Sequence, residues 1–259
     1  MNNVLAIASV VILEMIRRKD AYVLLFLTAL ITLLLGSVTF FGDPQIVRYL
    51  KEICLTLIWI SSVVIAVLTA ARQIPAERES RTIFPLLAKP VTRGQLIVGK
   101  FLGCWAACVI ALLAFYAFFC VMSGTREQAW PLLNYFQAFA MHSVFCGVVV
   151  ALALLGSVIY SAVSVNVTIA CTVVVGILFL GRHLRKIAWQ FNEPAATLLH
   201  LIYFAIPHLE MFDLRDLIIH NWSAAPWTAC LKAFLYATCY MIFLLGGAHL
   251  IFRRKPLHT

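Results

Sequence analysis

The sequence predicts an all-α polytopic membrane protein, and three observations lead to that fold class. Of the 259 residues, 63% are hydrophobic and 12% are charged, whereas a soluble domain is about half apolar and a quarter charged. Long stretches carry no Asp, Glu, Lys or Arg, and the longest covers residues 138–181. The basic residues behind the net charge of +9 gather in short segments between apolar stretches, as in cytoplasmic loops. This composition excludes a soluble enzyme, a disordered chain and a nucleic-acid binder.

Six segments are long and apolar enough to be predicted as transmembrane helices, since a span needs about 20 apolar residues. The uncharged stretch 138–181 would form about 66 Å of helix, twice the ~30 Å hydrocarbon core. It must therefore fold back once, and residues 161–166 are its most polar part. The predicted spans are residues 22–41, 53–71, 101–122, 138–160, 166–181 and 228–252.

Residues 1–19 are predicted to form an amphipathic helix in the membrane interface, before the first span. The segment is apolar but contains Glu14 and ends in the basic residues 17–19. A signal peptide would carry its positive charge before the apolar run, not after it. An interfacial helix with a weak polar arc fits this pattern better.

Residues 182–227 are predicted to form a re-entrant or interfacial segment on the outer side, before the last span. Its apolar part, residues 195–206, would cover about 18 Å as a helix, which is too short to cross a bilayer. Pro207 follows directly. If this part crossed the membrane, the basic residues 253–255 would lie outside, against the positive-inside rule.

The distribution of basic residues predicts that both termini are cytoplasmic. With a cytoplasmic N-terminus, 12 of the 20 Lys and Arg residues lie inside, in residues 17–19, 72–100 and 253–255. Seven of the 11 acidic residues then lie outside. We therefore expect one multi-pass domain over residues 1–259 with both termini in the cytoplasm.

The cytoplasmic loop of residues 72–100 has the most specific pattern in the chain. A charged stretch leads to a short apolar run, then to Pro90, and then to a helix-start signal at Thr92. Proline ends one element, and threonine is a favoured N-cap of the next. The pattern predicts a short helix across the cytoplasmic face, a turn, and the helix that re-enters as the third span. Such a loop suits the docking of a soluble partner.

This loop resembles that of ABC-2 type transporter permeases, the membrane subunits of ATP-driven exporters. Their loose pattern is Glu, three residues, Gly-Thr, an apolar pair, Leu-Leu, two residues, Pro-Val-Ser/Thr-Arg, and finally Gly-Lys entering a helix. Arg81 stands where the family usually has Gly. The matching residues are Glu77, Thr82, Leu86, Leu87, Pro90, Val91, Thr92, Arg93, Gly99 and Lys100.

The resemblance implies that the loop is a coupling helix that fits a cleft of a separate cytoplasmic ATPase subunit. It implies two ATPase copies and a second permease copy, in a homodimer or as a similar chain, with ATP and Mg bound by the ATPase instead of by this chain. It also implies a place in the inner membrane of a bacterial cell. The scarcity of ionisable residues in the spans favours an apolar or amphiphilic substrate over a small polar solute. Force transmission alone, as in the extraction of a lipid or lipoprotein, fits equally well. The expected ATPase-docking residues are Glu77, Glu79, Arg81, Thr82, Leu86, Leu87, Pro90 and Arg93.

A further resemblance is to the small permeases linked to multicopper-enzyme maturation and gliding motility. Residues 203–216 are similar to an outer segment of these permeases with the pattern Pro-Asn-Leu-Glu/Phe. His208 stands where Asn is commoner.

Gly94 to Lys100 matches the G-x-x-x-x-G-K half of a nucleotide-binding P-loop. Phe101 stands where the loop needs the Ser or Thr that holds magnesium, and a membrane helix follows directly. We interpret the match as a coincidence. We expect no catalytic, cofactor-binding or metal-binding residues on this chain.

The alternative from another class is an intramembrane redox or hydrolytic enzyme subunit that uses histidines and carboxylates on the outer side. The histidine spacings match no known metal-ligand pattern, and the carboxylates accompany Arg215, which favours salt bridges. The alternative predicts activity or a cofactor in the isolated chain, whereas the permease hypothesis predicts a bound ATPase. The outer residues concerned are Glu193, His200, His208, Glu210, Asp213, Asp216 and His220.

Overall fold

The computed structural model describes residues 3–37, 46–79, 92–128, 130–188 and 206–254, with positions 194, 197, 199, 201 and 203 between the last two ranges. Within these residues the chain is helical and has no β-strand. The helices are α1 (Asn3–Arg17), α2 (Asp20–Ser37), α3 (Ile46–Ala71), α4 (Pro75–Glu79), α6 (Arg93–Glu127), α7 (Leu132–Ile159), α8 (Val163–Ala188), the 3₁₀ turn η1 (Leu209–Phe212), α10 (Arg215–Ile219) and α11 (Trp227–Arg254).

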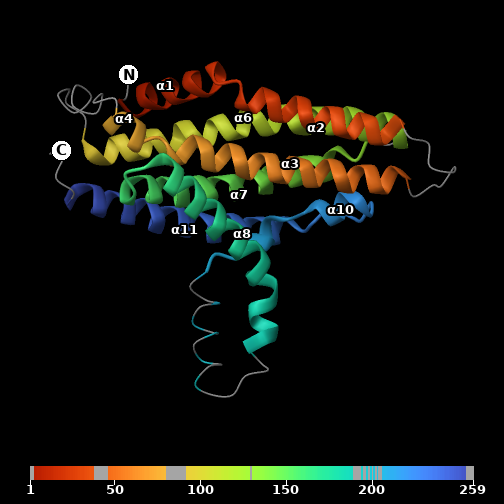
Figure 1. Cartoon of the computed structure of the whole chain (residues 1–259). Coiled ribbons are helices and arrows are strands. Elements are labelled where there is room, and N and C mark those ends of the chain that lie inside the picture. The colour runs from red at the N-terminus through yellow and green to blue at the C-terminus, as the bar shows by residue number, and fades with distance from the viewer. Residues whose placement is uncertain are drawn as a thin grey trace.

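The long helices form an elongated bundle with two distinct ends (Figure 1). One end holds α4, the start of α1, the start of α6 and the last turn of α11, and we call it the loop end. The opposite end holds α10, the start of α3 and the end of α6, and we call it the cap end. The described ends of the chain, Asn3 and Arg254, therefore lie at the same end of the bundle.

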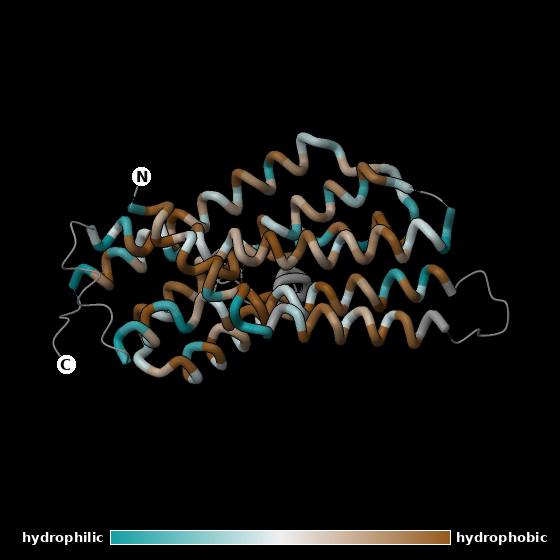
Figure 2. The backbone as a smooth tube through the Cα atoms, turned by 90° about the horizontal axis from the view of Figure 1, so that it is seen from above, coloured by the Kyte–Doolittle hydropathy of each residue, from teal (hydrophilic) through white to brown (hydrophobic). Residues whose placement is uncertain are grey.

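Helix α7 forms the centre of the bundle, with α3, α6 and α11 packed around it. Over its most apolar window, 78% of the residues are buried, against 17% for α11. The central parts of the long helices consist mostly of hydrophobic residues (Figure 2). Helix α11 exposes large apolar side chains, such as Ile242 and Phe243. Their contact with water would be unfavourable, whereas contact with lipid is favourable.

Helix α1 packs closely against the first turns of α6. A Cβ added at Gly103 would lie 2.7 Å from the Cβ of Val11, and one added at Gly99 would lie 2.9 Å from that of Ile7. Glycines four residues apart let two helix backbones approach closely in a membrane protein. On its other side α1 exposes Leu5. The predicted N-terminal helix is therefore present, and its place in the interface stays a prediction.

Four described helical segments are long and apolar enough to cross a bilayer: Val47–Glu79, Arg93–Glu127, Leu132–Ile159 and Trp227–Arg254. The described apolar stretches of the other two predicted spans are shorter, Tyr22–Leu34 in α2 and Val163–Phe179 in α8. Each of the six predicted spans falls on a helix, but a count of six membrane crossings stays a prediction.

The long uncharged stretch breaks after α7 ends at Ile159, and α8 begins at Val163. This break lies beside the polar stretch expected to hold the turn. Helix α8 begins against α3 and α7, and its later part projects away from the bundle (Figure 1). The apolar stretch 195–206, expected to be re-entrant or interfacial, lies almost entirely outside the described residues.

Candidate partner-docking site

The candidate docking loop leaves the bundle after α4 and returns to it at α6. Of the residues expected to dock an ATPase, the structure describes Glu77, Glu79 and Arg93. The other five lie outside the described residues: Arg81, Thr82, Leu86, Leu87 and Pro90. The described part of the site therefore consists of the two ends of the loop, which are fixed to the bundle by different contacts.

The start of the loop is held by an ion pair between Glu77 and Lys100. Lys100 Nζ donates to Glu77 Oε1, and the two side chains are only 6% and 16% exposed. Lys100 is on the second turn of α6, so the pair joins α4 to α6. A buried carboxylate needs such a partner because desolvation alone would penalise its charge. Glu79, by contrast, is exposed.

The end of the loop is held by Thr92 and Arg93. Thr92 is the N-cap of α6, as the sequence predicts, and it forms a capping box with Gln95: Thr92 Oγ1 accepts from Gln95 N at 3.2 Å, and Thr92 N donates to Gln95 Oε1 at 3.0 Å. Arg93 Nη1 donates to the carbonyls of Phe252 and Arg253, both at 2.8 Å. These carbonyls end α11, where helix geometry leaves them without an intrahelical partner.

The residues of the P-loop-like match have structural roles in this fold. Gly99 provides the close approach of α1 to α6, and Lys100 pairs with Glu77. An added Cβ at Gly94 would lie 3.5 Å from the His249 ring on α11. Packing and one ion pair therefore account for these residue types without a nucleotide.

An open concavity of about 960 Å³ lies beside the loop, between α4 and the α7–α8 turn. Arg78 and Glu79 line one wall, while Ser161, Ser164 and Thr168 line the other. The concavity offers hydrogen-bonding and charged groups directly next to the point where the loop leaves the bundle.

Asn166 joins three helices at this end, and sequence reasoning gave it no role. Its Nδ2 donates to the carbonyls of Ala71, at 2.9 Å, and Ala153, at 3.1 Å. The side chain is 1% exposed. An added Cβ at Gly156 would lie 2.1 Å from Asn166 Oδ1, so the glycine is required by the asparagine. The signal in the sequence was an amide inside an apolar stretch, where a polar residue needs a partner.

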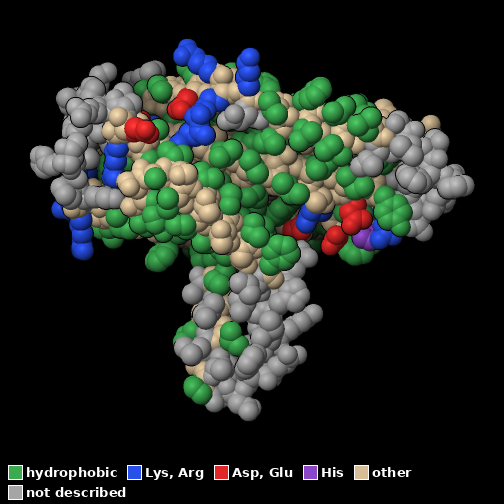
Figure 3. All heavy atoms as spheres, viewed as in Figure 1, with side chains coloured by type: hydrophobic (Ala, Val, Ile, Leu, Met, Phe, Trp, Pro, Cys, Tyr) green, Lys and Arg blue, Asp and Glu red, His purple; other side chains and the backbone are tan. Residues whose placement is uncertain are grey.

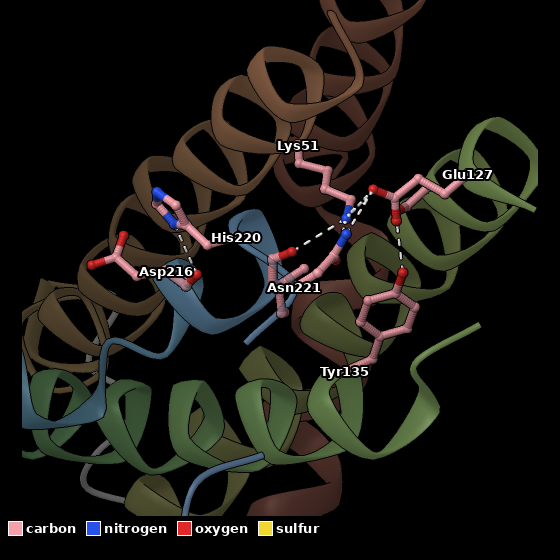
Figure 4. Close-up of polar contacts among 8 residues, drawn as sticks. Lys51, Glu127, Tyr135, Asp216, His220 and Asn221 are labelled. Carbon is pink, nitrogen blue, oxygen red and sulfur yellow. Dashed lines mark hydrogen bonds and ion pairs between the residues drawn. The ribbon is translucent and has the colours of Figure 1, made fainter. Parts of the chain in front are cut away.

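The cap end contains a second buried ion pair, between Lys51 of α3 and Glu127 of α6 (Figure 4). The distance from Lys51 Nζ to Glu127 Oε1 is 2.6 Å, and the lysine side chain is completely buried. Lys51 also donates to Asn221 Oδ1 at 2.9 Å and to the carbonyl of Ile218 at 3.2 Å. The pair thereby holds the segment that contains α10 on the end of the bundle.

His220 adds a second contact between this segment and α3. Its Nε2 lies 2.6 Å from Arg48 Nη2, its Nδ1 lies 3.1 Å from the Asp216 carbonyl, and its ring stacks on Trp222 with centroids 4.9 Å apart. His208 contacts Tyr236 of α11, with Nδ1 2.8 Å from the hydroxyl. Both of these histidines, predicted to lie on the outer side, thus contact protein groups, and His200 lies outside the described residues.

A buried polar and aromatic cluster surrounds His142. Because α7 begins at Leu132, His142 lies deeper in its helix than the predicted start at residue 138 implied. Its Nε2 is 2.7 Å from Ser62 Oγ and its Nδ1 is 3.2 Å from the Tyr116 hydroxyl. The ring stacks on Trp59 with centroids 4.8 Å apart. The residue is 1% exposed and joins α3, α6 and α7.

Arg215 connects this cluster to the segment that contains α10. Two of its nitrogens donate to the Asp213 carboxylate, each at 2.8 Å, which confirms the salt bridge favoured from the sequence. The guanidinium lies over the Trp59 ring, 5.0 Å from its centroid. Burial alone would lower the pKa of Arg215, but the hydrogen bonds and charge of Asp213 outweigh it and raise that pKa. Arg215 therefore stays charged at any physiological pH.

These features define an integral membrane protein whose helices are tied together at both ends and which presents a loop at one of them. The chain belongs to the ABC-2 family of transporter proteins, whose family description matches residues 2–257. It is thus a membrane permease of an ABC transporter, a class that normally works with a cytoplasmic ATPase subunit. No curated protein matches the chain at a significant level.

Proposed function

We propose that this chain is the permease half of an ATP-driven exporter and that the loop after α4 receives force from the ATPase. The observation that carries the proposal is that both ends of the loop are attached to the bundle by polar contacts. Its start is tied to α6 by Glu77 and Lys100, and its end is tied to α11 by Arg93. A push on the loop therefore reaches several bundle helices through buried or charge-assisted contacts, which resist deformation.

These attachments divide the docking residues expected from the sequence into two groups. Glu77 and Arg93 hold the loop in place, so we assign them to positioning. The partner contact falls to exposed Glu79 and to the loop residues between, with Leu86 and Leu87 as the apolar anchors. Burial of two leucines in a cleft supplies about 3–6 kcal/mol at most, before association costs.

The rest of the assembly follows from the family. We propose two copies of this chain, two ATPase subunits that bind ATP and Mg, cytoplasmic termini and the inner membrane of a bacterial cell. The apolar side chains that α2 and α11 expose, such as Phe26 and Phe243, favour an apolar or amphiphilic cargo that moves along the bundle surface. The outer histidines that have protein partners disfavour the alternative of an intramembrane enzyme.

The test is co-purification of the ATPase with the permease, followed by its transport-coupled turnover. Leu86→Ala and Leu87→Ala together are expected to lower ATPase binding at least tenfold, which corresponds to about 1.4 kcal/mol. The matched control is Leu132→Ala with Leu133→Ala, two exposed leucines in the first turn of α7 at the far end of the bundle. Full binding and coupling in the loop variant would refute docking at this loop.

A further inference from the structure

Exposed Trp and Tyr side chains lie at the starts of several bundle helices. Among the described residues, five such side chains are more than half exposed. Three of them begin the helices that run from the cap end to the loop end: Tyr49 lies in the first turn of α3, Trp130 two residues before α7, and Trp227 at the first residue of α11. Trp222 follows α10, and Tyr22 lies in the first turn of α2, which runs in the opposite direction (Figure 1). We call Tyr49, Trp130, Trp222 and Trp227 the aromatic belt.

Two residues of the aromatic belt are held at the cap end by α6 and α7. A Cβ added at Gly124 of α6 would lie 2.5 Å from the Trp130 ring, so the ring packs directly on the glycine. Asn134 Nδ2 of α7 donates to the Trp222 carbonyl at 2.9 Å. Trp and Tyr combine an apolar ring with a polar N–H or O–H, and they are enriched where hydrocarbon meets lipid headgroups. The aromatic belt therefore suits such a boundary.

The distance from the aromatic belt to the charges beyond the other end of α3 matches the thickness of a bilayer. Between Glu52 and Arg72 the chain has 19 residues without charge, which form about 29 Å of helix. The hydrocarbon of a typical bilayer is about 30 Å thick. Lys and Arg side chains gather over the α1–α2 junction and charged side chains also lie at the cap end, whereas the surface between these regions is mostly hydrophobic (Figure 3).

The charged start of α2 lies at nearly the same level as Arg72. Thr28 of α2 contacts Ser61 of α3, with the two hydroxyl oxygens 3.4 Å apart. The two helices run antiparallel (Figure 1), and eight residues separate Thr28 from Asp20, the first residue of α2. Asp20 therefore lies near the level of Thr69, one helical turn from Arg72. Both helices thus become charged at one boundary.

The other bundle helices are almost free of charge between these two boundaries. Residues 101–125 of α6 and 132–159 of α7 contain no Asp, Glu, Lys or Arg. On α11 the charged residue is Lys232, five residues or about 7.5 Å after Trp227. Its side chain is exposed, and a lysine in such a position extends its stem along apolar surface until the ammonium reaches the headgroups.

We propose that the aromatic belt is a lipid-binding surface that lies in the headgroup layer of one leaflet, and that the hydrocarbon ends near Arg72 and Asp20 in the other leaflet. The N–H and O–H groups of the belt then donate to phosphate and ester oxygens of the lipids, while the rings contact the upper parts of the acyl chains. The placement holds whichever end of the bundle faces the cytoplasm, so it does not rest on the proposed function.

This placement puts Lys100 outside the hydrocarbon. Thr69 Oγ1 lies 3.9 Å from Cys108 Sγ, so these residues of α3 and α6 share a level. Arg72 is three residues, or about 4.5 Å, nearer the loop end than Thr69, whereas Lys100 is eight residues, or about 12 Å, nearer than Cys108. The buried pair of Lys100 with Glu77 therefore lies beyond the acyl chains.

The start of α1 lies at the same depth as this pair. Ile7 packs on Gly99, the residue next to Lys100. Leu5, which is exposed on this part of α1, therefore faces lipid headgroups instead of acyl chains.

The test is quenching of tryptophan fluorescence in the full chain, reconstituted in phosphatidylcholine liposomes whose acyl chains are brominated either near the headgroup or near the chain end. All variants carry Trp189→Phe, so that the emission comes from tryptophans that the structure describes. Bromine near the headgroup is expected to quench at least twofold more than bromine near the chain end. The triple variant Trp130→Phe, Trp222→Phe and Trp227→Phe is expected to lose most of this quenching, because Trp59 is buried and Trp105 is half-buried.

Two matched leucine variants, each made in the triple variant, test the other boundary. Leu5→Trp on α1 and Leu235→Trp on α11 replace leucines that are 59% and 56% exposed, and Leu235 lies eight residues, or about 12 Å, beyond Trp227. Bromine near the headgroup is expected to quench Leu5→Trp more strongly, and bromine near the chain end is expected to quench Leu235→Trp more strongly.

Three results would overturn the proposal. Stronger quenching of the aromatic belt by bromine near the chain end would place the belt inside the hydrocarbon. Absence of quenching by both lipids would place it in water or against a second copy of the chain. Stronger quenching of Leu5→Trp by bromine near the chain end would show that the hydrocarbon extends over α1.

Discussion

Each end of the bundle contains the same kind of contact, a buried lysine–glutamate pair between α6 and the α3–α4 stretch. At the cap end the lysine comes from α3 and the glutamate from α6, as Lys51 and Glu127. At the loop end the roles are exchanged, with Lys100 from α6 and Glu77 from α4. Because α3 and α6 run in opposite directions (Figure 1), each helix carries its lysine near its own start.

The two ends differ in the additional hydrogen bonds that the lysine of each pair makes. Lys51 also binds Asn221 and the Ile218 carbonyl, so the cap end closes a segment of the chain onto the bundle. The pair at the loop end fixes only the point where the loop begins, and exposed Glu79 lies just beyond it. One end is thus completed by the chain itself, whereas the other is the end at which we propose that a partner docks.

The largest effect is expected from Lys51→Met at the cap end. The substitution leaves Glu127, Asn221 and a carbonyl without their shared donor, and breaking a buried pair in this way costs about 3–5 kcal/mol. Thermal unfolding in detergent measures the loss. Lys51→Met with Glu127→Leu is expected to recover much of it, since the orphaned charge is gone. Lys232→Met, at an exposed position, is the matched control. An unchanged unfolding temperature for Lys51→Met would show that the pair does not hold this end.

A smaller loss of stability is expected from Lys100→Met at the loop end, because Lys100 binds one carboxylate there, whereas Lys51 binds three groups. We expect about 1–3 kcal/mol, with a disproportionate loss of ATPase turnover that is coupled to transport. The double variant Lys100→Met with Glu77→Leu is expected to regain stability but not coupling. Coupling in the two single variants is compared under conditions where the same fraction of each is folded. If Lys51→Met then impaired coupling as strongly as Lys100→Met does, the contrast between the two ends would be wrong.

The sequence predicted the helices well because the physical signal for them is local. Uncharged apolar stretches locate α6, α7 and α11, and the Pro90 to Thr92 pattern locates the start of α6. The boundaries were less accurate elsewhere: α3 begins at Ile46 and α7 at Leu132, seven and six residues before the spans predicted from residues 53 and 138. Hydropathy marks the part of a helix that lies in lipid, whereas the helix itself continues into the headgroup region.

The pairs that fix both ends could not be predicted because their partners are distant or were assigned elsewhere. Lys51 and Glu127 lie 76 residues apart in the sequence, and no local pattern joins them. Glu77 was expected to meet a partner protein, and Lys100 appeared in a coincidental P-loop match. The glycine at 156 and Asn166 face each other across the α7–α8 turn, which only the fold-back brings together.

The smallest effect is expected from Arg93→Met, which tests the end of the loop rather than its start. The side chain donates to two terminal carbonyls of α11, and its guanidinium carbon lies 5.6 Å from the Phe252 ring centroid. Loss of such capping costs about 1 kcal/mol, confined to the last turn. Amide hydrogen exchange near Phe252 is therefore expected to speed up about fivefold, since 1.4 kcal/mol is tenfold.

Arg254→Met is the matched control, because Arg254 is an exposed arginine on the same turn. It is expected to leave exchange unchanged, and neither variant is expected to alter exchange in α10 at the cap end. If exchange were uniform across the bundle in Arg93→Met, Arg93 would stabilise the fold as a whole. The loop would then lack a separate anchor on α11, and force from the ATPase would have to enter through the Glu77–Lys100 pair alone.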